Sequence, residues 1–134
     1  MSIKLSGRSI SRGIGDGEAL VSKDAISFLG GVDAKTGMVV EKGHALEGKC
    51  IAGRVLVFPR GKGSTVGSYV LYQLAKNGVA PAAIVNLEAE IIVAVGAIVS
   101  NIPMVDKLEK DPLALIKDGQ VVKVDGTNGT IEIG

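Results

Sequence analysis

The segment PRGKGSTVGSYVLYQLAKNG, residues 59–78, places two basic residues, two glycines and two hydroxyl groups directly before an amphipathic stretch. Arginine and lysine supply full positive charges, and glycine lets the backbone approach a ligand closely. A helix beginning at Ser64 or Thr65 would add unpaired backbone N–H groups and the positive end of its dipole, which favour an anion. A deprotonated serine is stabilised in such a place, so Ser64 could serve as a base or nucleophile. The predicted site consists of Arg60, Gly61, Lys62, Gly63, Ser64 and Thr65.

The same pattern is also typical of an ordinary turn followed by a capped helix. Serine and threonine are preferred N-caps, and glycine, arginine and lysine are common in exposed turns. The segment does not match the P-loop pattern, because Lys62 is followed by glycine rather than by serine or threonine. It does not match the dinucleotide fingerprint either, because Val66 stands three residues after Gly63, where a glycine is required. Nucleotide hydrolysis is therefore disfavoured, and an anion site and a helix cap both stay open.

Other reactive side chains give weaker signals. His44, in EKGHALEGK, could accept a proton or a phosphoryl group, but the sequence shows no partner for it, so we interpret it as a loop histidine. Cys50 is the one cysteine, which excludes an internal disulfide and a cysteine-ligated zinc or iron–sulfur site within this chain. The remaining acidic candidates are too scattered to nominate a carboxylate pair, and we interpret most of them as solvated turn or cap residues: Asp16, Glu18, Asp33, Glu88, Glu90 and Asp106.

Composition limits the class of protein. The chain has 134 residues and is 46% hydrophobic, enough to build a core in one domain, residues 1–134. Fifteen basic residues against 14 acidic ones leave a net charge of +1, so no electrostatic signal indicates nucleic acid or a membrane surface as partner. The apolar runs are too short to span a bilayer and the beginning of the chain lacks a signal-peptide pattern, so we expect a cytoplasmic protein.

The elements that must position the loop follow from periodicity and turn residues. We predict strands at 3–10, 17–22, 50–58, 82–87 and 102–108, a loop and then a strand within 26–40, a helix at about 64–77, a helix at 89–100 that is either continuous or broken near Gly96, a helical turn at 112–116 and a closing hairpin within 119–133. This order predicts a mixed α/β fold, with a parallel β-α-β middle and a second small β layer.

Several ordered segments resemble the small, swivelling-domain subunit of the aconitase X family. They are GEALVS at 17–22, ISFLGGVDAKTG at 26–37, IAGRVLVFPRGKGSTVGSYVLYQL at 51–74 and AAIVNLEAEIIVAVGAI at 82–98. The resemblance implies the swivelling β/β/α domain found as the mobile domain of aconitases, an expectation that agrees with the order of elements above.

The resemblance also implies a function. Such a chain forms a heterodimer with a large catalytic subunit whose cysteines hold an iron–sulfur cluster (4Fe-4S), while the small subunit binds no metal. Ser64 would be the proton acceptor in the dehydration of a small phosphorylated hydroxy acid, (R)-5-phosphomevalonate, to trans-anhydromevalonate 5-phosphate in an archaeal-type mevalonate pathway. One alternative is the small subunit of a cis-3-hydroxyproline dehydratase. Another is a non-catalytic or phosphohistidine-type swivel module, because DGQVVKVDGTNGTIEI resembles the closing hairpin of phosphotransfer domains.

Overall fold

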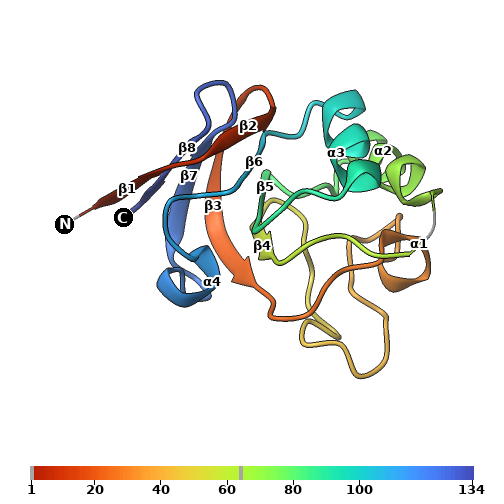
Figure 1. Ribbon diagram of the computed structural model, residues 1–134. Helices are drawn as coiled ribbons and strands as arrows, with labels where there is room; N and C mark the ends of the chain where they lie inside the picture. The colour runs from red at the N-terminus through yellow and green to blue at the C-terminus, as the bar shows by residue number, and fades with distance from the viewer. Residues whose placement is uncertain (1, 64) are drawn as a thin grey trace.

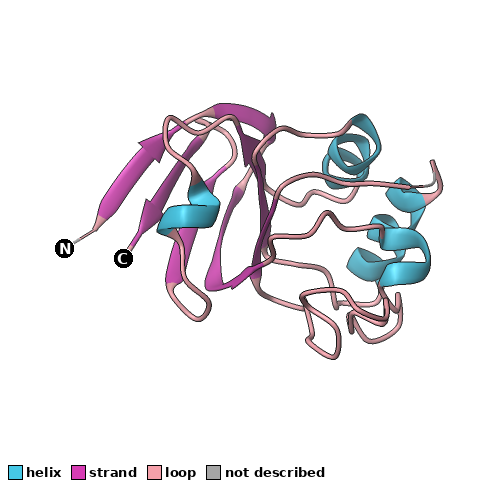
Figure 2. Cartoon of the chain, turned by 60° about the horizontal axis from the view of Figure 1, so that its bottom comes forward, coloured by secondary structure: helices cyan, strands magenta, loops and turns pink. Residues whose placement is uncertain are grey.

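The computed structural model, which describes residues 2–63 and 65–134, has three layers (Figure 1). The strands form one curved sheet in the order β1-β8-β7-β3-β4-β5-β6-β2. Figure 2 shows the strands gathered in one half of the molecule, and Figure 1 places α1, α2 and α3 in the other half and α4 beside the strands. This arrangement confirms the predicted β/β/α fold.

The bounds of the elements are as follows. The strands are β1 (Ile3–Ser6), β2 (Arg8–Ser11), β3 (Ile14–Val21), β4 (Val55–Phe58), β5 (Ala83–Asn86), β6 (Met104–Asp106), β7 (Val121–Asp125) and β8 (Thr130–Ile133). The helices are α1 (Phe28–Gly31), α2 (Gly67–Lys76), α3 (Ile91–Val99) and α4 (Pro112–Leu115).

The centre of the sheet consists of β3, β4, β5 and β6, which pair in parallel. Every residue of β4 and β5 is buried, because α2 and α3 cover one face of these strands and the antiparallel strands β7, β8 and β1 fold over the other. Alternate side chains therefore enter two separate cores. Phe58 lies in the helical core, where its ring meets Phe28 edge to face at 6.1 Å, and Val57 lies in the core between the strand layers.

Several predicted elements are confirmed. The parallel β4-α2-β5 unit, the helical turn α4 and the hairpin of β7 and β8 form where the sequence predicted them. Helix α3 is continuous through Gly96. Glycine is needed at this position because a Cβ would come within 2.7 Å of Leu71 Cδ1 and 2.9 Å of Ser68 Cα on α2, so it allows the two helices to pack closely.

Other predictions were wrong in their bounds. The strand at 3–10 is divided at Gly7, the strand at 50–58 begins only at Val55, and residues 32–50 form isolated bridges rather than a strand. Strand β3 begins at Ile14, three residues before the predicted start at Gly17, and runs through Gly15 and Gly17. Their missing side chains are required inside the strand, because a Cβ on Gly17 would lie 2.7 Å from the Gly53 carbonyl oxygen and one on Gly15 would overlap the Ala82 carbonyl.

Candidate active site

The predicted loop lies at the carboxyl ends of the parallel strands. Residues 59–66 follow β4, residues 87–90 follow β5, and residues 22–27 follow β3. Because neighbouring parallel strands end at the same edge of a sheet, the three segments meet there, which is where open α/β sheets commonly bind ligands.

Backbone hydrogen bonds join these segments to one another. Ile26 N–H donates to the Arg60 carbonyl at 3.2 Å, and Lys62 N–H donates to the Ile26 carbonyl at 3.0 Å. On the other side, Leu87 N–H donates to the Pro59 carbonyl at 3.0 Å. The loop is thus held on both flanks. The segment beginning at Ile26 therefore borders the loop directly.

Glycine is required at positions 61 and 63 of the loop for two different structural reasons. A Cβ on Gly61 would overlap Val93 Cγ2 and lie 3.0 Å from Glu90 Oε1, so a side chain there would push the loop away from α3. Gly63 has a φ of +95°, and a Cβ on it would lie 2.7 Å from Ser27 Oγ. Both glycines are therefore required by packing and backbone conformation, whatever ligand the loop takes.

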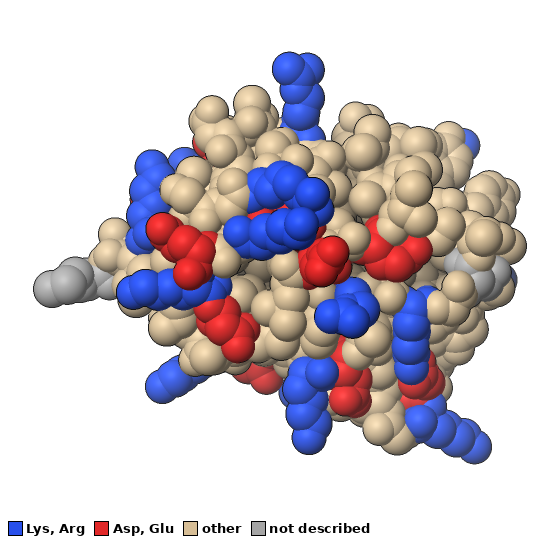
Figure 3. Space-filling view, in the orientation of Figure 1, with Lys and Arg blue, Asp and Glu red and all other residues tan. Residues whose placement is uncertain are grey.

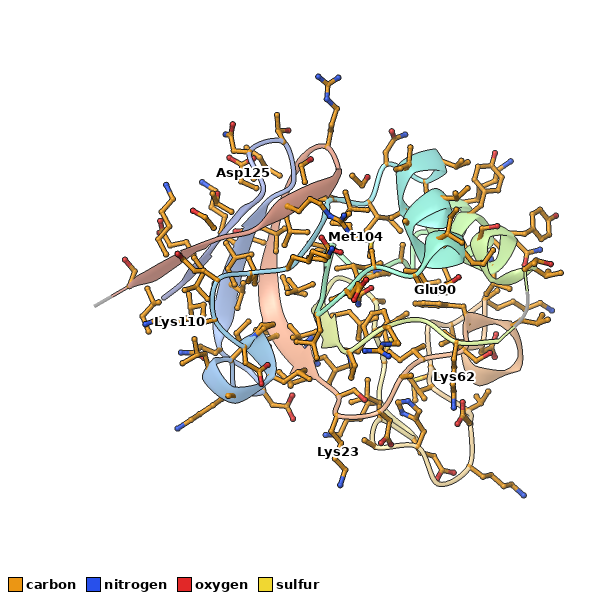
Figure 4. All side chains as sticks on the ribbon, in the orientation of Figure 1. Lys23, Lys62, Glu90, Met104, Lys110 and Asp125 are labelled. Carbon is orange, nitrogen blue, oxygen red and sulfur yellow. The ribbon has the colours of Figure 1, made fainter. Side chains whose placement is uncertain are left out.

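The two basic residues of the loop have different surroundings. Exposed Arg60 borders a hollow of about 230 Å³ that is also lined by Glu88, Ala89 and Glu90. The Lys62 ammonium lies 3.3 Å from the Glu41 carboxylate, a partner that the sequence analysis did not identify. Figure 4 shows Lys62 and Glu90 in the helical half of the molecule, away from Asp125 at the hairpin. The site therefore contains carboxylates as well as cations.

The helix N-termini at this edge differ from the prediction. Helix α2 begins at Gly67 with Val66 at the N-cap position, so the expected start at Ser64 or Thr65 was wrong, and Thr65 is not the cap. Exposed Thr65 instead accepts a hydrogen bond on its carbonyl from Ser68 Oγ at 3.4 Å. The first turn of α3 is already occupied by a negative group, because Ile92 N–H and Val93 N–H donate to the Glu90 carboxylate at 2.8 and 3.2 Å. The first turn of α3 therefore does not offer free N–H groups to an anion, and the full positive charges of the described loop are those of Arg60 and Lys62.

Ser64, the predicted catalytic residue, lies outside the described residues. Its two neighbours in the chain, Gly63 and Thr65, are described, and both are exposed.

Asp106 is an exception among the acidic residues, most of which we interpreted as solvated turn or cap residues. This side chain is fully buried at the end of β6, where Arg8 Nε and Nη2 donate to its two oxygens at 2.9 and 2.7 Å. Ala89 N–H donates to the same carboxylate at 2.7 Å, which fixes the segment that lines the hollow. The hydrogen bonds and charge of Asp106, followed by the charge of Glu88, raise the pKa of the Arg8 guanidinium above its ordinary value. The sequence shows a charged residue at the end of a short apolar strand. It does not show that Asp106 is buried, because this depends on the pairing of β6 with β2.

The side chains of His44 and Cys50 both form hydrogen bonds within the fold. Leu46 N–H donates to His44 Nδ1 at 3.0 Å, so Nε2 carries the proton and donates to the Ala25 carbonyl at 2.9 Å. His44 thus joins its loop to the segment after β3, in agreement with its interpretation as a loop histidine. The Cys50 thiol donates to the Thr36 carbonyl at 3.4 Å.

Two further observations concern metals and membranes. In residues 2–63 and 65–134, no three His, Cys, Asp or Glu side chains are grouped so that they could hold a metal ion. The described part of the chain contains no helix that is both long enough and apolar enough to cross a bilayer. Figure 3 shows acidic and basic side chains interspersed over the left and lower parts of the face it presents.

The fold and the site define a β/β/α domain that presents a charged, glycine-rich loop at the carboxyl edge of its parallel strands. The chain belongs to the family described as the Aconitase X swivel domain, which matches residues 4–133. It is 67% identical to the phosphomevalonate dehydratase small subunit of Methanosarcina acetivorans, over 98% of this chain and 91% of that one. It is 66% identical to the protein of the same name from Methanocella arvoryzae, over 98% and 99% of the two chains. The crystal structure of Thermococcus kodakaraensis aconitase X in its holo-form is similar, with 53% identity, a TM-score of 0.93 and 98% of both chains covered.

Proposed function

We propose that this chain is the small subunit of a two-subunit hydro-lyase that dehydrates (R)-5-phosphomevalonate to trans-anhydromevalonate 5-phosphate. The observation that supports this most strongly is identity of 50 to 67% along nearly the whole chain to relatives that bear the name phosphomevalonate dehydratase small subunit. The alternatives, a hydroxyproline dehydratase subunit and a phosphohistidine swivel module, have no such support. For the swivel module, the buried and doubly hydrogen-bonded His44 is a further argument against a phosphoacceptor.

The chemistry assigned to this chain is proton removal. In our proposal Ser64 accepts the proton from the carbon next to the substrate carboxylate, as the hydroxyl at the neighbouring carbon departs. In the sequence Ser64 stands two residues after Lys62 and three before Gly67, the first residue of α2, and positive charge near a serine favours its deprotonated form. The iron–sulfur cluster implied by the family resemblance belongs to the partner subunit in this proposal, and when bound it supplies a Lewis acid for the departing hydroxyl.

The anionic ends of the substrate need positive charge. We assign Arg60 to one end, because its side chain borders the hollow at the carboxyl edge. The Lys62 ammonium is paired with Glu41 at 3.3 Å, so an anion would have to compete with that carboxylate for it. The Lys62 side chain is about half exposed and the Glu41 side chain about one-third exposed, so this ion pair is weak. A phosphate can therefore replace Glu41 as the partner of Lys62. Gly61, Gly63 and Thr65 would contribute backbone contacts along the loop.

The size of the hollow supports the need for a large subunit. A pocket for a small molecule usually encloses roughly 300–1,000 Å³, and the hollow at Arg60 has about 230 Å³ and is open to solvent. It also contains two carboxylates, which do not favour a substrate with two anionic ends. A second chain that closes this edge would complete the enclosure and exclude water from the reacting atoms.

The test is an anaerobic dehydration assay with (R)-5-phosphomevalonate, this chain and a cluster-loaded large subunit from the same source. We expect activity only when both chains are present, and loss of about 10²- to 10⁴-fold in rate with Ser64→Ala. Thr65→Ala, the neighbouring hydroxyl deletion, is the matched variant and should retain far more activity. The unfolding temperature of each variant, measured alone, should equal that of the original chain.

Two outcomes would contradict the proposal. If the two chains form a complex that leaves phosphomevalonate unchanged, the substrate is wrong. If Ser64→Ala is fully active, Ser64 is not the proton acceptor and the loop has only a structural role.

A further inference from the structure

The outer face of α2 and α3 is unusually apolar. Between the two helices lies a groove of about 260 Å³ lined by Ser68, Tyr69, Tyr72, Val95 and Val99, which we call the α2–α3 groove. Seven large apolar residues of the described chain on these helices and their first turns are more than one-third exposed: Val66, Tyr69, Tyr72, Ile91, Val95, Ile98 and Val99. Their spacing of three, four or seven residues places them along one side of each helix.

No charged residue interrupts this face. Residues 66–75 and 91–99 contain no Asp, Glu, Lys or Arg, and the first cation is Lys76, whose ammonium lies 5.6 Å from the centre of the Tyr72 ring. Figure 3 shows the contrast, because the upper right of the molecule, over α2 and α3, is nearly free of the blue and red side chains that are scattered over the left, centre and lower parts of that view. Isolated exposed apolar residues are normal, whereas apolar residues that gather on one face without a charge between them are typical of an interaction site.

The groove is continuous with the candidate active site. Gly67 packs on Ile92 and Gly96 packs on Leu71, so the two helices run side by side in the same direction. Helix α2 begins directly after the loop that contains Arg60, and α3 begins directly after Glu90, so the groove starts at the edge where the hollow opens. A protein bound over the hollow would therefore also contact the groove.

We propose that the α2–α3 groove is the surface on which the large subunit docks. This inference rests on the proposed function, because that function requires a larger partner to enclose the hollow. A standard interface buries roughly 800 Å² on each partner, with an apolar centre and a polar rim. The groove supplies the apolar centre and two tyrosines, which are enriched at such centres, and the charged loops at the hollow supply the rim. A second copy of this chain would cover the groove but would bring another small subunit to the site rather than the missing half.

The experiment measures the affinity of this full chain for the large subunit, with Val99→Lys compared to Val121→Lys. The two valines are similarly exposed, 59% and 53%, but Val121 lies on β7, which is separated from α2 and α3 by the parallel strands (Figure 1). We expect Val99→Lys to weaken binding by about tenfold or more, because a lysine would be buried in the apolar centre, and Val121→Lys to leave affinity unchanged. Tyr69→Lys tests the other wall of the groove, and unfolding temperatures show that each variant is folded.

Turnover separates docking from chemistry. Excess Val99→Lys chain should restore full dehydration of phosphomevalonate, whereas excess Ser64→Ala chain should not. A complex that binds normally yet does not dehydrate phosphomevalonate contradicts the proposed function but still reports on the groove through affinity. Equal affinities for Val99→Lys, Tyr69→Lys and Val121→Lys would overturn the docking surface. So would a result in which the groove variants abolish self-association of this chain without changing its affinity for the large subunit.

Discussion

Gly61→Ala should separate the structural role of the loop from its chemistry. The added Cβ would overlap Val93 Cγ2 on the first turn of α3 and approach Glu90 Oε1 to 3.0 Å. Gly61 is not among the residues with positive φ, so alanine itself is compatible with the backbone there and the effect comes from the contact alone. Because Gly61 also pairs with Ile26 on its other side, the contact is relieved only if the Val93 side chain moves or if the loop shifts away from α3 together with the Ile26 segment.

The cost follows from overpacking. Extra carbon atoms in a packed site cost about 1–3 kcal/mol, and replacing glycine by alanine returns about 0.4–1 kcal/mol by restricting the unfolded chain. We expect a net loss of about 1–2 kcal/mol in the free energy of unfolding. A shift of Arg60 by about 1 Å should in addition lower kcat/KM of the assembled enzyme by on the order of a hundredfold.

A double-mutant cycle identifies the contact. Val93→Ala removes the methyl group that the new Cβ would meet, so the double variant should be more stable than the sum of the two single effects by about 0.5–3 kcal/mol. Urea unfolding of the four chains measures this difference. The control is Gly67→Ala, whose Cβ would make an ordinary 3.5 Å contact with Ile92 and which should stabilise α2 by up to about 1 kcal/mol. Additive effects of Gly61→Ala and Val93→Ala would refute the packing argument, and so would unchanged stability of Gly61→Ala.

Three further predictions concern polar groups outside the loop. Asp106→Asn should lower the free energy of unfolding by about 1.5–3 kcal/mol, because an amide has one acceptor oxygen for a site where Arg8 and a backbone N–H both donate; unchanged urea unfolding would contradict this. His44→Ala should cost about 1–3 kcal/mol by leaving the part-buried Ala25 carbonyl and the buried Leu46 N–H without their partner, whereas a reactive histidine would change turnover and leave thermal unfolding unaltered. Backbone and side-chain hydrogen bonds from Asn128 lower the pKa of Asp125 below its ordinary 3.8, so their contribution is present above that pH and is lost as pH falls through the lower folded value. Asn128→Ala should therefore destabilise the chain at neutral pH and differ less from the original below about pH 3.8, and a difference in urea unfolding that stays constant down to pH 2 would exclude this cause.

Local sequence determined most of the elements and the place of the candidate site. Runs of β-branched residues such as VLVF make β4 a buried strand, and apolar spacing with Asn77-Gly78 ends α2 where the pattern predicts, since Gly78 adopts a φ of +73°. The basic, glycine-rich loop after that strand is visible without a structure, because the carboxyl ends of parallel strands gather at one edge. The family resemblance then covers nearly the whole chain.

Tertiary structure decided the partners of those residues. The predicted strand starts only at Gly17, whereas close backbone contacts require a glycine also at position 15, inside β3, and Asp106 is buried because β2 brings Arg8 beside it. Likewise Glu41 meets Lys62 only because the 38–48 loop folds back to the site, 21 residues away along the chain. Such contacts depend on distances between segments far apart in sequence, whereas helix and strand preferences depend on neighbours within a few residues. For that reason the sequence by itself located the loop, and the fold alone determined which charges surround it and how α2 and α3 form one apolar face beside it.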